Sequence, residues 1–146
     1  MSKKTHLAFA LFLSSYLLRS NPQLLIFVPI VFVSAMLPDL DLALRSIPFI
    51  EHRKTFHNIW FMIAVMIIFW SLTHDALLTR LFSIGIVSHF LMDSLTKQGV
   101  MWLYPLSNWR IRGPLRTGGL VDSLIGAASI LASAYLMTGY LSQPLS

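Results

Sequence analysis

Residues 77–93 read LLTRLFSIGIVSHFLMD, an apolar run that ends on a histidine and an aspartate. His89 and Asp93 are four residues apart, so on a helix both side chains lie on one face and can bind one ion. Ionisable groups at the end of an apolar helix are costly and usually serve a function. A local hydrogen-bonded pair is the alternative. This stretch predicts a helix, and we interpret its polar end as part of a metal site.

The composition indicates a membrane protein. The chain has 146 residues, of which 55% are hydrophobic and only 12% charged, and its mean hydropathy is +0.69. A soluble domain carries roughly a quarter charged residues, so lipid must cover much of this surface. No linker or change in composition divides the chain, and we expect one domain over residues 1–146.

Two further counts restrict the ligands and partners. The sequence has no cysteine, so a metal would bind imidazole nitrogen and carboxylate oxygen, which suits zinc, manganese, iron or magnesium. The formal charge of +5 is scattered between apolar runs. We therefore expect membrane lipids with anionic head groups as partners, and no nucleic acid.

Apolar stretches recur along the chain, and they predict the fold. They cover Leu7–Leu18, Leu24–Leu37, Ile59–Leu72, Leu77–Met92 and Leu120–Tyr140. We expect tight turns at Asn21-Pro22, between the first two stretches, and at Thr73-His74-Asp75, between the third and fourth. Backbone groups in lipid must pair internally, which favours helices, and short spans can tilt or thin the bilayer. We expect an all-α polytopic membrane bundle of about five transmembrane helices. Residues 94–119 form either an interfacial amphipathic segment or a loop with aromatic anchors.

The distribution of cations predicts the topology. The first stretch lacks a small-residue cleavage site, so we expect a retained helix. Successive crossings then place the N-terminus and residues 38–58 and 93–119 on one side, with nine of the eleven Lys and Arg residues. Loops rich in Lys and Arg stay in the cytoplasm. We expect an integral protein of the cell (inner) membrane, with the N-terminus cytoplasmic and the C-terminus on the opposite side.

This topology brings polar residues from all five helix ends to one membrane level. They are His6, Asp39, Asp41, His52, His57, His89, Asp93 and Asp122. Taken singly, each has a simpler explanation: Pro38-Asp39 can end one helix and cap the next, and a histidine in an interfacial loop can be solvated. Their convergence is what indicates a shared site.

The motifs follow a recognisable order. They are Thr5-His6-Leu7, Leu37-Pro38-Asp39-Leu40-Asp41, His52-Arg53 with His57, Ser88-His89-Phe90-Leu91-Met92-Asp93, Thr96, Gly99-Val100, Leu103-Tyr104-Pro105 and Thr117-Gly118-Gly119. In this order, the chain resembles the YdjM-type family of inner-membrane metal-dependent hydrolases from residue 5 to about residue 122. It is similar, more loosely, to the zinc-dependent phospholipase C class.

The resemblance implies metal-dependent hydrolysis, and it implies the ligands His6, Asp39, His52, His57, His89 and Asp93. The chain departs from the family at Lys54, where the family usually has glycine, and at Asn58, where it has serine. Asp122 stands where the family commonly has glutamate, and its shorter side chain would ligate differently or orient a histidine.

We therefore expect a membrane-embedded hydrolase that uses one or more divalent ions, zinc first, to cleave a phosphoester of a lipid or another membrane-associated substrate. Asp41 or Asp122 would act as general base or complete the coordination. Arg53, and with it Arg112 and Arg116, would bind the phosphate and offset its charge.

Two other classes stay open. A metal or proton transporter also carries carboxylates and imidazoles in membrane helices, although here they gather at one face. A non-catalytic membrane scaffold would use the same groups for structural hydrogen bonds.

A single cysteine introduced by Arg110→Cys tests the topology, because the chain has none of its own. We expect a membrane-impermeant maleimide to label it only from the cytoplasmic side, and to label a His74→Cys control only from the other side. The reverse pattern would invert the orientation.

Overall fold

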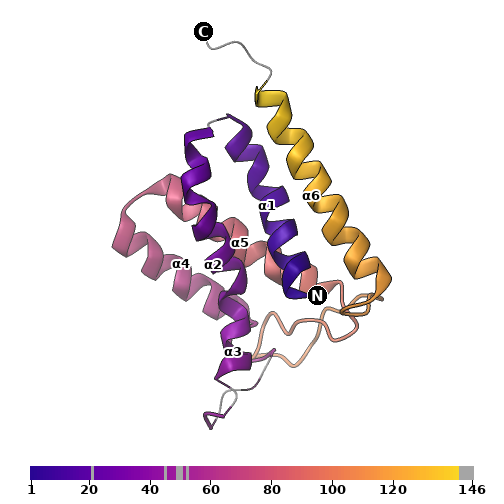
Figure 1. Ribbon diagram of the computed structural model, residues 1–146. Coiled ribbons are helices and arrows are strands. Elements are labelled where there is room, and N and C mark those ends of the chain that lie inside the picture. Colours follow the sequence, from indigo (N-terminus) through magenta and orange to yellow (C-terminus); the bar gives the residue numbers. More distant parts are fainter. Residues whose placement is uncertain (21, 45, 49–50, 52, 142–146) are drawn as a thin grey trace.

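The apolar stretches form helices in the computed structural model, which describes residues 1–20, 22–44, 46–48, 51 and 53–141. The main helices are α1 (Lys3–Ser20), α2 (Val28–Met36), α4 (Ile59–Thr73), α5 (Ala76–Ser94) and α6 (Leu120–Leu141) (Figure 1). Three segments are long and apolar enough to cross a membrane: Gln23–Ala43, Ala76–Ser94 and Leu120–Thr138. Helix α4 is apolar but shorter. The predicted all-α membrane bundle is confirmed.

The second span is built from short helical pieces. The 3₁₀ turn η1 (Pro22–Phe27) precedes α2, and η2 (Leu37–Asp39) and α3 (Leu40–Ala43) follow it. We expected the segment from residue 38 onward to be a loop, and this was wrong for its first six residues. Pro38 has no N–H to donate, so the chain tightens into a 3₁₀ turn and then resumes as a helix. Asp39 and Asp41 consequently lie on ordered turns.

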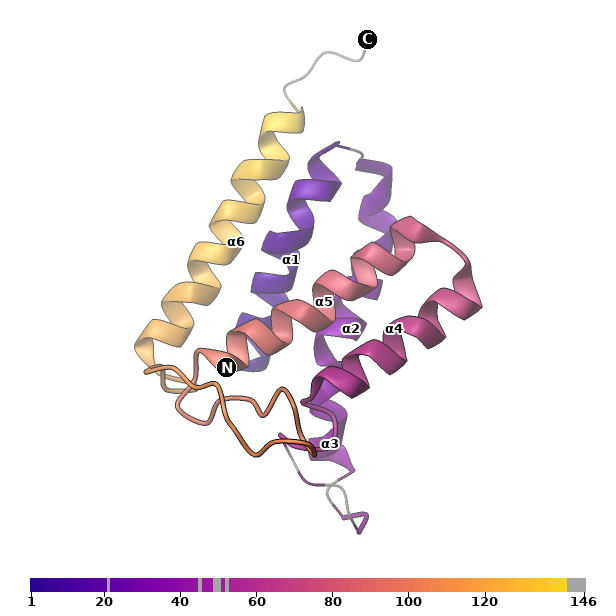
Figure 2. The same cartoon turned by 180° about the vertical axis from the view of Figure 1, so that it is seen from behind.

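Helix α5 lies at the centre of the bundle. Helices α1, α2 and α4 all pack against it, and α6 packs along α1 on the outside. Figure 2 shows that α4 and α5 run obliquely to the steep pair α1 and α6. Leu81 of α5 is fully buried with Ala10, Val31 and Ala35 of the neighbouring helices.

The ends of the helices are arranged as the topology predicts. The N-terminus, α3 and the loop between α5 and α6 lie at one end of the molecule, and the connections from α1 to α2 and from α4 to α5 lie at the other (Figure 1). The predicted turn at residues 73–75 is confirmed: His74 ends α4 in the left-handed region, and Asp75 caps α5. Asn21, which we placed in the first turn, lies outside the described residues.

The segment from Leu95 to Gly119 is a loop that packs on the helix ends. Isolated bridges join Thr96 to Leu115 and Val100 to Ile111. Trp102 anchors the loop, because its carbonyl accepts from the backbone N–H of Ile59 at 2.8 Å and its indole donates to Ser94 Oγ at 2.9 Å. The segment is therefore a loop with an aromatic anchor, and its position at the membrane interface stays a prediction.

A close approach between α2 and α5 fixes the centre of the bundle. A Cβ on Gly85 would lie 1.9 Å from Ser34 Oγ and 2.4 Å from the carbonyl oxygen of Val31, so only glycine fits. Small residues let membrane helices approach this closely. One turn after Gly85, His89 reaches the backbone of α2, so this contact also positions a candidate ligand.

The substitution Gly85→Leu tests this contact. We expect it to destabilise the folded protein by about 1–3 kcal/mol, the usual cost of overpacking, and to lower the unfolding temperature in detergent. Ala128→Leu adds a side chain at an exposed position of α6 and should leave that temperature nearly unchanged. Equal effects of the two substitutions would show that the contact is not tight.

Candidate metal centre

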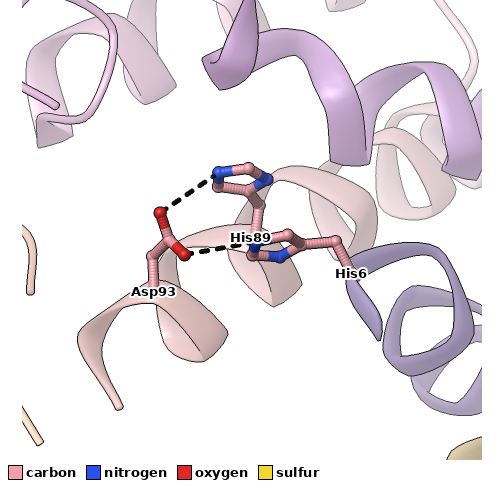
Figure 3. Close-up of side chains that lie close together, drawn as sticks. All are labelled: His6, His89 and Asp93. Atoms are coloured by element: carbon pink, nitrogen blue, oxygen red, sulfur yellow. Dashed lines mark ion pairs between the residues drawn. The ribbon is translucent and has the colours of Figure 1, made fainter. Parts of the chain in front are cut away.

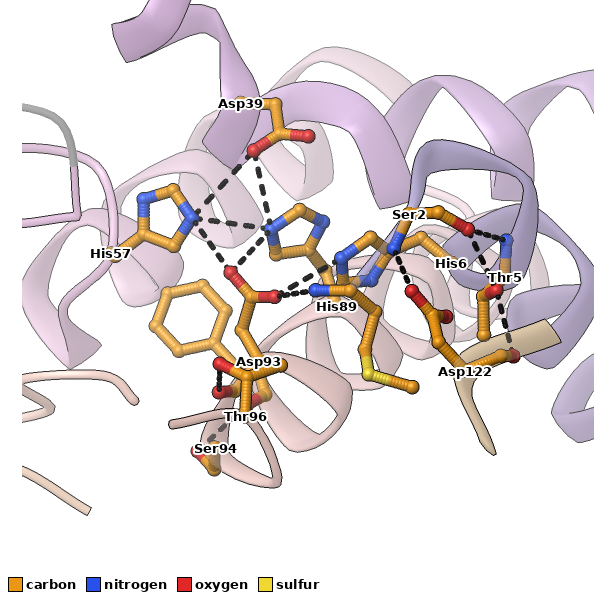
Figure 4. A network of polar contacts seen from close by, with 12 residues as sticks. Ser2, Thr5, His6, Asp39, His57, His89, Asp93, Ser94, Thr96 and Asp122 are labelled. Carbon is orange, nitrogen blue, oxygen red and sulfur yellow. Dashed lines mark hydrogen bonds and ion pairs between the residues drawn. The ribbon is translucent and has the colours of Figure 1, made fainter. Parts of the chain in front are cut away.

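Four donor atoms from three parts of the chain converge at the N-terminal end of the bundle (Figure 4). The Nε2 atoms of His57 and His89 are 3.2 Å apart. Asp39 Oδ1 lies 3.9 Å from the first and 3.7 Å from the second. Asp93 Oδ2 lies 3.6 Å and 3.7 Å from the same two atoms. We call these four residues the donor cluster.

The spacing of the donor cluster suits a small cation. Zinc binds histidine nitrogen and carboxylate oxygen at about 2.0–2.2 Å in tetrahedral sites, which places neighbouring ligand atoms about 3.3–3.6 Å apart. The five distances given above, each of which includes a histidine Nε2, range from 3.2 to 3.9 Å. Hence an ion can be accommodated with shifts of a few tenths of an ångström.

The hydrogen bond of His89 fixes its tautomer. Its Nδ1 atom lies 2.7 Å from the carbonyl oxygen of Ala35. A carbonyl can only accept, so Nδ1 carries the proton and donates it. The lone pair of the neutral ring is therefore on Nε2, the atom that points into the donor cluster.

His57 is oriented in the same way by a carboxylate. Its Nδ1 atom donates to Asp41 Oδ2 at 2.9 Å, an arrangement that commonly orients metal-binding histidines. Burial disfavours a charged His57 ring, but the hydrogen bond to Asp41 and the nearby negative charge of Asp93 outweigh it and raise the pKa of His57. The surroundings of its Nε2 therefore favour a cation.

The two Nε2 atoms consequently need a positive charge between them, since two neutral lone pairs at 3.2 Å repel. A proton on one ring would supply it. A metal ion would in addition satisfy Asp93 Oδ2, a buried oxygen without a hydrogen bond of good geometry among the described residues. The donor cluster could therefore hold a metal ion between the two rings.

The balance of charge points the same way. Asp39, Asp41 and Asp93 bring three carboxylates to the site. Arg53 brings one guanidinium, and the N-terminal ammonium of Met1 pairs with Asp93 Oδ1. Buried charges require compensation. Among these groups a net charge of one negative unit is left, so the site still favours an additional cation.

Arg53 holds the cluster against the loop after α5. It has a positive φ of 64°, a conformation that costs a non-glycine residue about 1–2 kcal/mol. Its backbone N–H donates to Asp41 Oδ2 at 2.9 Å, and its Nη2 lies 3.1 Å from Asp93 Oδ2. Its Nη1 donates to Thr96 Oγ1 and to the carbonyl of Gly99. These contacts offset the strain.

His6 lies beside the donor cluster rather than within it. Its Nε2 atom is 3.2 Å from Asp93 Oδ1, whereas His89 faces the other oxygen of this carboxylate (Figure 3). The ring stacks on His89 with centroids 3.9 Å apart. His6, His89 and Asp93 form a second group that could hold a metal, alongside the group of Asp39, His57 and His89. His89 is common to the two groups.

The other predicted site residues lie outside the donor cluster or outside the described residues. Asp122 Oδ2 accepts from the backbone N–H groups of Ser2 and Gly118, so it ties the starts of α1 and α6 together. Arg112 and Arg116 are exposed on the loop, and within the described residues no hydrogen bond or ion pair joins them to the donor cluster. His52 lies outside the described residues.

Backbone groups of the site were not predictable from the motifs. The carbonyl of Ala35 and the N–H of Arg53 orient the two histidines, directly or through Asp41. One signal was present: Pro38 follows Ala35 by three residues, and a helix that ends there leaves its last carbonyls without partners. Gly85, one turn before His89, is a similar signal of a close helix contact.

Fold and site together define an all-helical membrane protein with a buried histidine and aspartate cluster at one end of its bundle. The chain belongs to the YdjM inner membrane protein family, which matches residues 1–143. It is also 34% identical over 86 residues to the uncharacterized protein YvsG of Bacillus subtilis (strain 168). That match covers 58% of this chain and 53% of YvsG, about half its length. No solved structure matches the chain.

The bond from His57 to Asp41 gives a test of the metal site. Asp41→Asn removes the charge that orients His57 and should weaken divalent metal binding about 10–100-fold, the usual cost of losing such a partner. Competition with a chromophoric chelator measures the affinity. Asp75→Asn, in the turn at the other end of the molecule, is the matched control and should bind metal as the wild type does. Equal affinities for all three proteins would rule out this role of Asp41.

Proposed function

We propose that this protein is a membrane-embedded, metal-dependent hydrolase that cleaves a phosphoester at the membrane surface. The observation that carries the proposal is the pair of inward-facing Nε2 atoms of His57 and His89, 3.2 Å apart between two carboxylates. Family membership supports the membrane setting. We infer the cytoplasmic face from the excess of cations on that side.

The donor cluster has one accessible edge, as a catalytic site requires. His57, His89 and Asp93 are almost fully buried, whereas the side chain of Asp39 is 18% exposed. The Asp39 oxygen is also further from each histidine than they are from each other. A divalent ion bound here would lower the pKa of its water to about 7, so that hydroxide is available at neutral pH.

The residues around the accessible edge have distinct roles in the proposed reaction. Hydrolysis joins the water oxygen to phosphorus and breaks the bond from phosphorus to the ester oxygen, which leaves with a proton as an alcohol. Asp39, the most exposed carboxylate of the cluster, accepts the proton of the water. Arg53 contributes positive charge beside Asp93, and its Nε–H has no hydrogen-bond partner among the described residues.

The position of the cluster favours a membrane-associated substrate. The cluster lies where the second span and α5 end, beside a loop with exposed apolar residues that include Leu106 and Trp109. Aromatic residues with neighbouring cations are typical of the head-group layer. A lipid phosphate would therefore present its ester at the depth of the donor cluster.

Phosphate release by the purified protein tests the proposal. We expect the zinc- or manganese-loaded wild type to release phosphate from a lipid phosphate in mixed micelles, and from the soluble substrate para-nitrophenyl phosphate more slowly. His89→Ala removes a metal ligand. It should lower the rate of phosphate release by more than the loss of about 10–100-fold that is typical when a residue that only orients a ligand is removed. His74→Ala, at the other end of the molecule, is the control and should retain full activity.

Two outcomes would contradict the hydrolase. One is a metal-loaded wild type that releases no phosphate from any of these substrates. The other is metal or proton flux in proteoliposomes that depends on His89 while phosphate release is absent, which would favour the transporter.

A further inference from the structure

An apolar groove runs along the membrane-facing side of the second span, between it and α1. Its lining is entirely aliphatic or aromatic and consists of Leu7, Phe32, Val33, Met36, Leu37 and Leu40. Its volume is about 390 Å³, within the range of about 300–1,000 Å³ that small-molecule sites occupy. An occupant of this groove must be apolar, because no charged or polar side chain lines it.

The groove adjoins the donor cluster through residues that are neighbours in the chain. Leu7 follows His6, and Leu37 and Leu40 lie on either side of the turn that carries Asp39. Asp39 is the most accessible member of the cluster, and Figure 4 shows it reaching from this segment toward the Nε2 atoms of His57 and His89. The accessible edge of the cluster and the end of the groove therefore share one segment.

The length of the groove suits a hydrocarbon chain. From Leu40 to Phe32 the second span rises about 12 Å toward the middle of the bundle. Val33 is 61% exposed and Leu40 is 47% exposed, so the groove is open sideways to the lipid. A molecule in the bilayer could enter without leaving the membrane.

We propose that this groove holds the hydrocarbon chain of the substrate lipid while its phosphate group lies at the donor cluster. The inference rests on the proposed hydrolase function and makes it more specific. The substrate class is a long-chain lipid phosphate, and the groove selects it over short-chain or soluble esters.

A photoreactive lipid reports the position of the chain independently of catalysis. The probe is an alkyl phosphate with a diazirine near the end of its chain, added to the metal-loaded full-length protein in micelles. We expect labelling between residues 32 and 40 and at Leu7, and weaker labelling by the matching alcohol without phosphate. Val33→Trp fills the groove and should abolish this labelling. Ile67→Trp, on α4 at a similarly exposed position (60%), should not.

The same pair of variants predicts a difference in substrate selectivity. Val33→Trp should lower kcat/KM for dodecyl phosphate about tenfold, as expected when roughly two methylene groups lose their burial. It should leave para-nitrophenyl phosphate hydrolysis and metal content unchanged. Ile67→Trp should leave both hydrolysis rates and the metal content unchanged.

Several results would overturn the proposal. Labelling spread evenly over α4 and α6, or equal labelling of the groove by phosphate and alcohol probes, would mean that ordinary bilayer lipid fills it. Crosslinks between two protein chains through the groove would assign it to a second copy. Phosphate release without labelling of the groove would refute only the proposal that the groove binds the lipid chain. Phosphate-dependent labelling without any hydrolysis would refute only the proposed hydrolase activity.

Discussion

Two imidazole nitrogens that point at each other across 3.2 Å are the interaction on which this site depends. Each ring is held in place from behind, His89 by a backbone carbonyl and His57 by Asp41. Neither ring can turn its lone pair away without losing a buried hydrogen bond. The surrounding carboxylates then favour positive charge between the two nitrogens, which a proton or a metal ion could supply.

Contacts between the helices hold these atoms in position. The glycine contact between α2 and α5 brings His89 to the end of α2, where Pro38 interrupts the helix and leaves carbonyls available. Arg53 joins the segment before α4 to the loop after α5, and it adopts a left-handed backbone conformation to do so. Strain of this kind is characteristic of functional sites.

Much of this arrangement was predictable from sequence because a bilayer permits few alternatives. Apolar runs must become helices, and alternating crossings bring His6, Asp39, His57, His89 and Asp93 to one end of the bundle. The separate roles of the two neighbouring aspartates were not predictable. Asp39 and Asp41 are two residues apart and look equivalent, yet one reaches the donor cluster and the other orients His57 from behind. That difference depends on the 3₁₀ turn that contains Pro38 and on backbone N–H donors, which a sequence motif does not reveal.

X-ray absorption at the metal edge of the zinc-loaded protein reports directly whether an ion binds between His57 and His89. We expect nitrogen and oxygen ligands at about 2.0–2.2 Å, with the multiple-scattering pattern of two imidazoles, and loss of one imidazole contribution in His57→Ala. A spectrum without imidazole scattering, or one that His57→Ala leaves unchanged, would contradict a metal ion between His57 and His89.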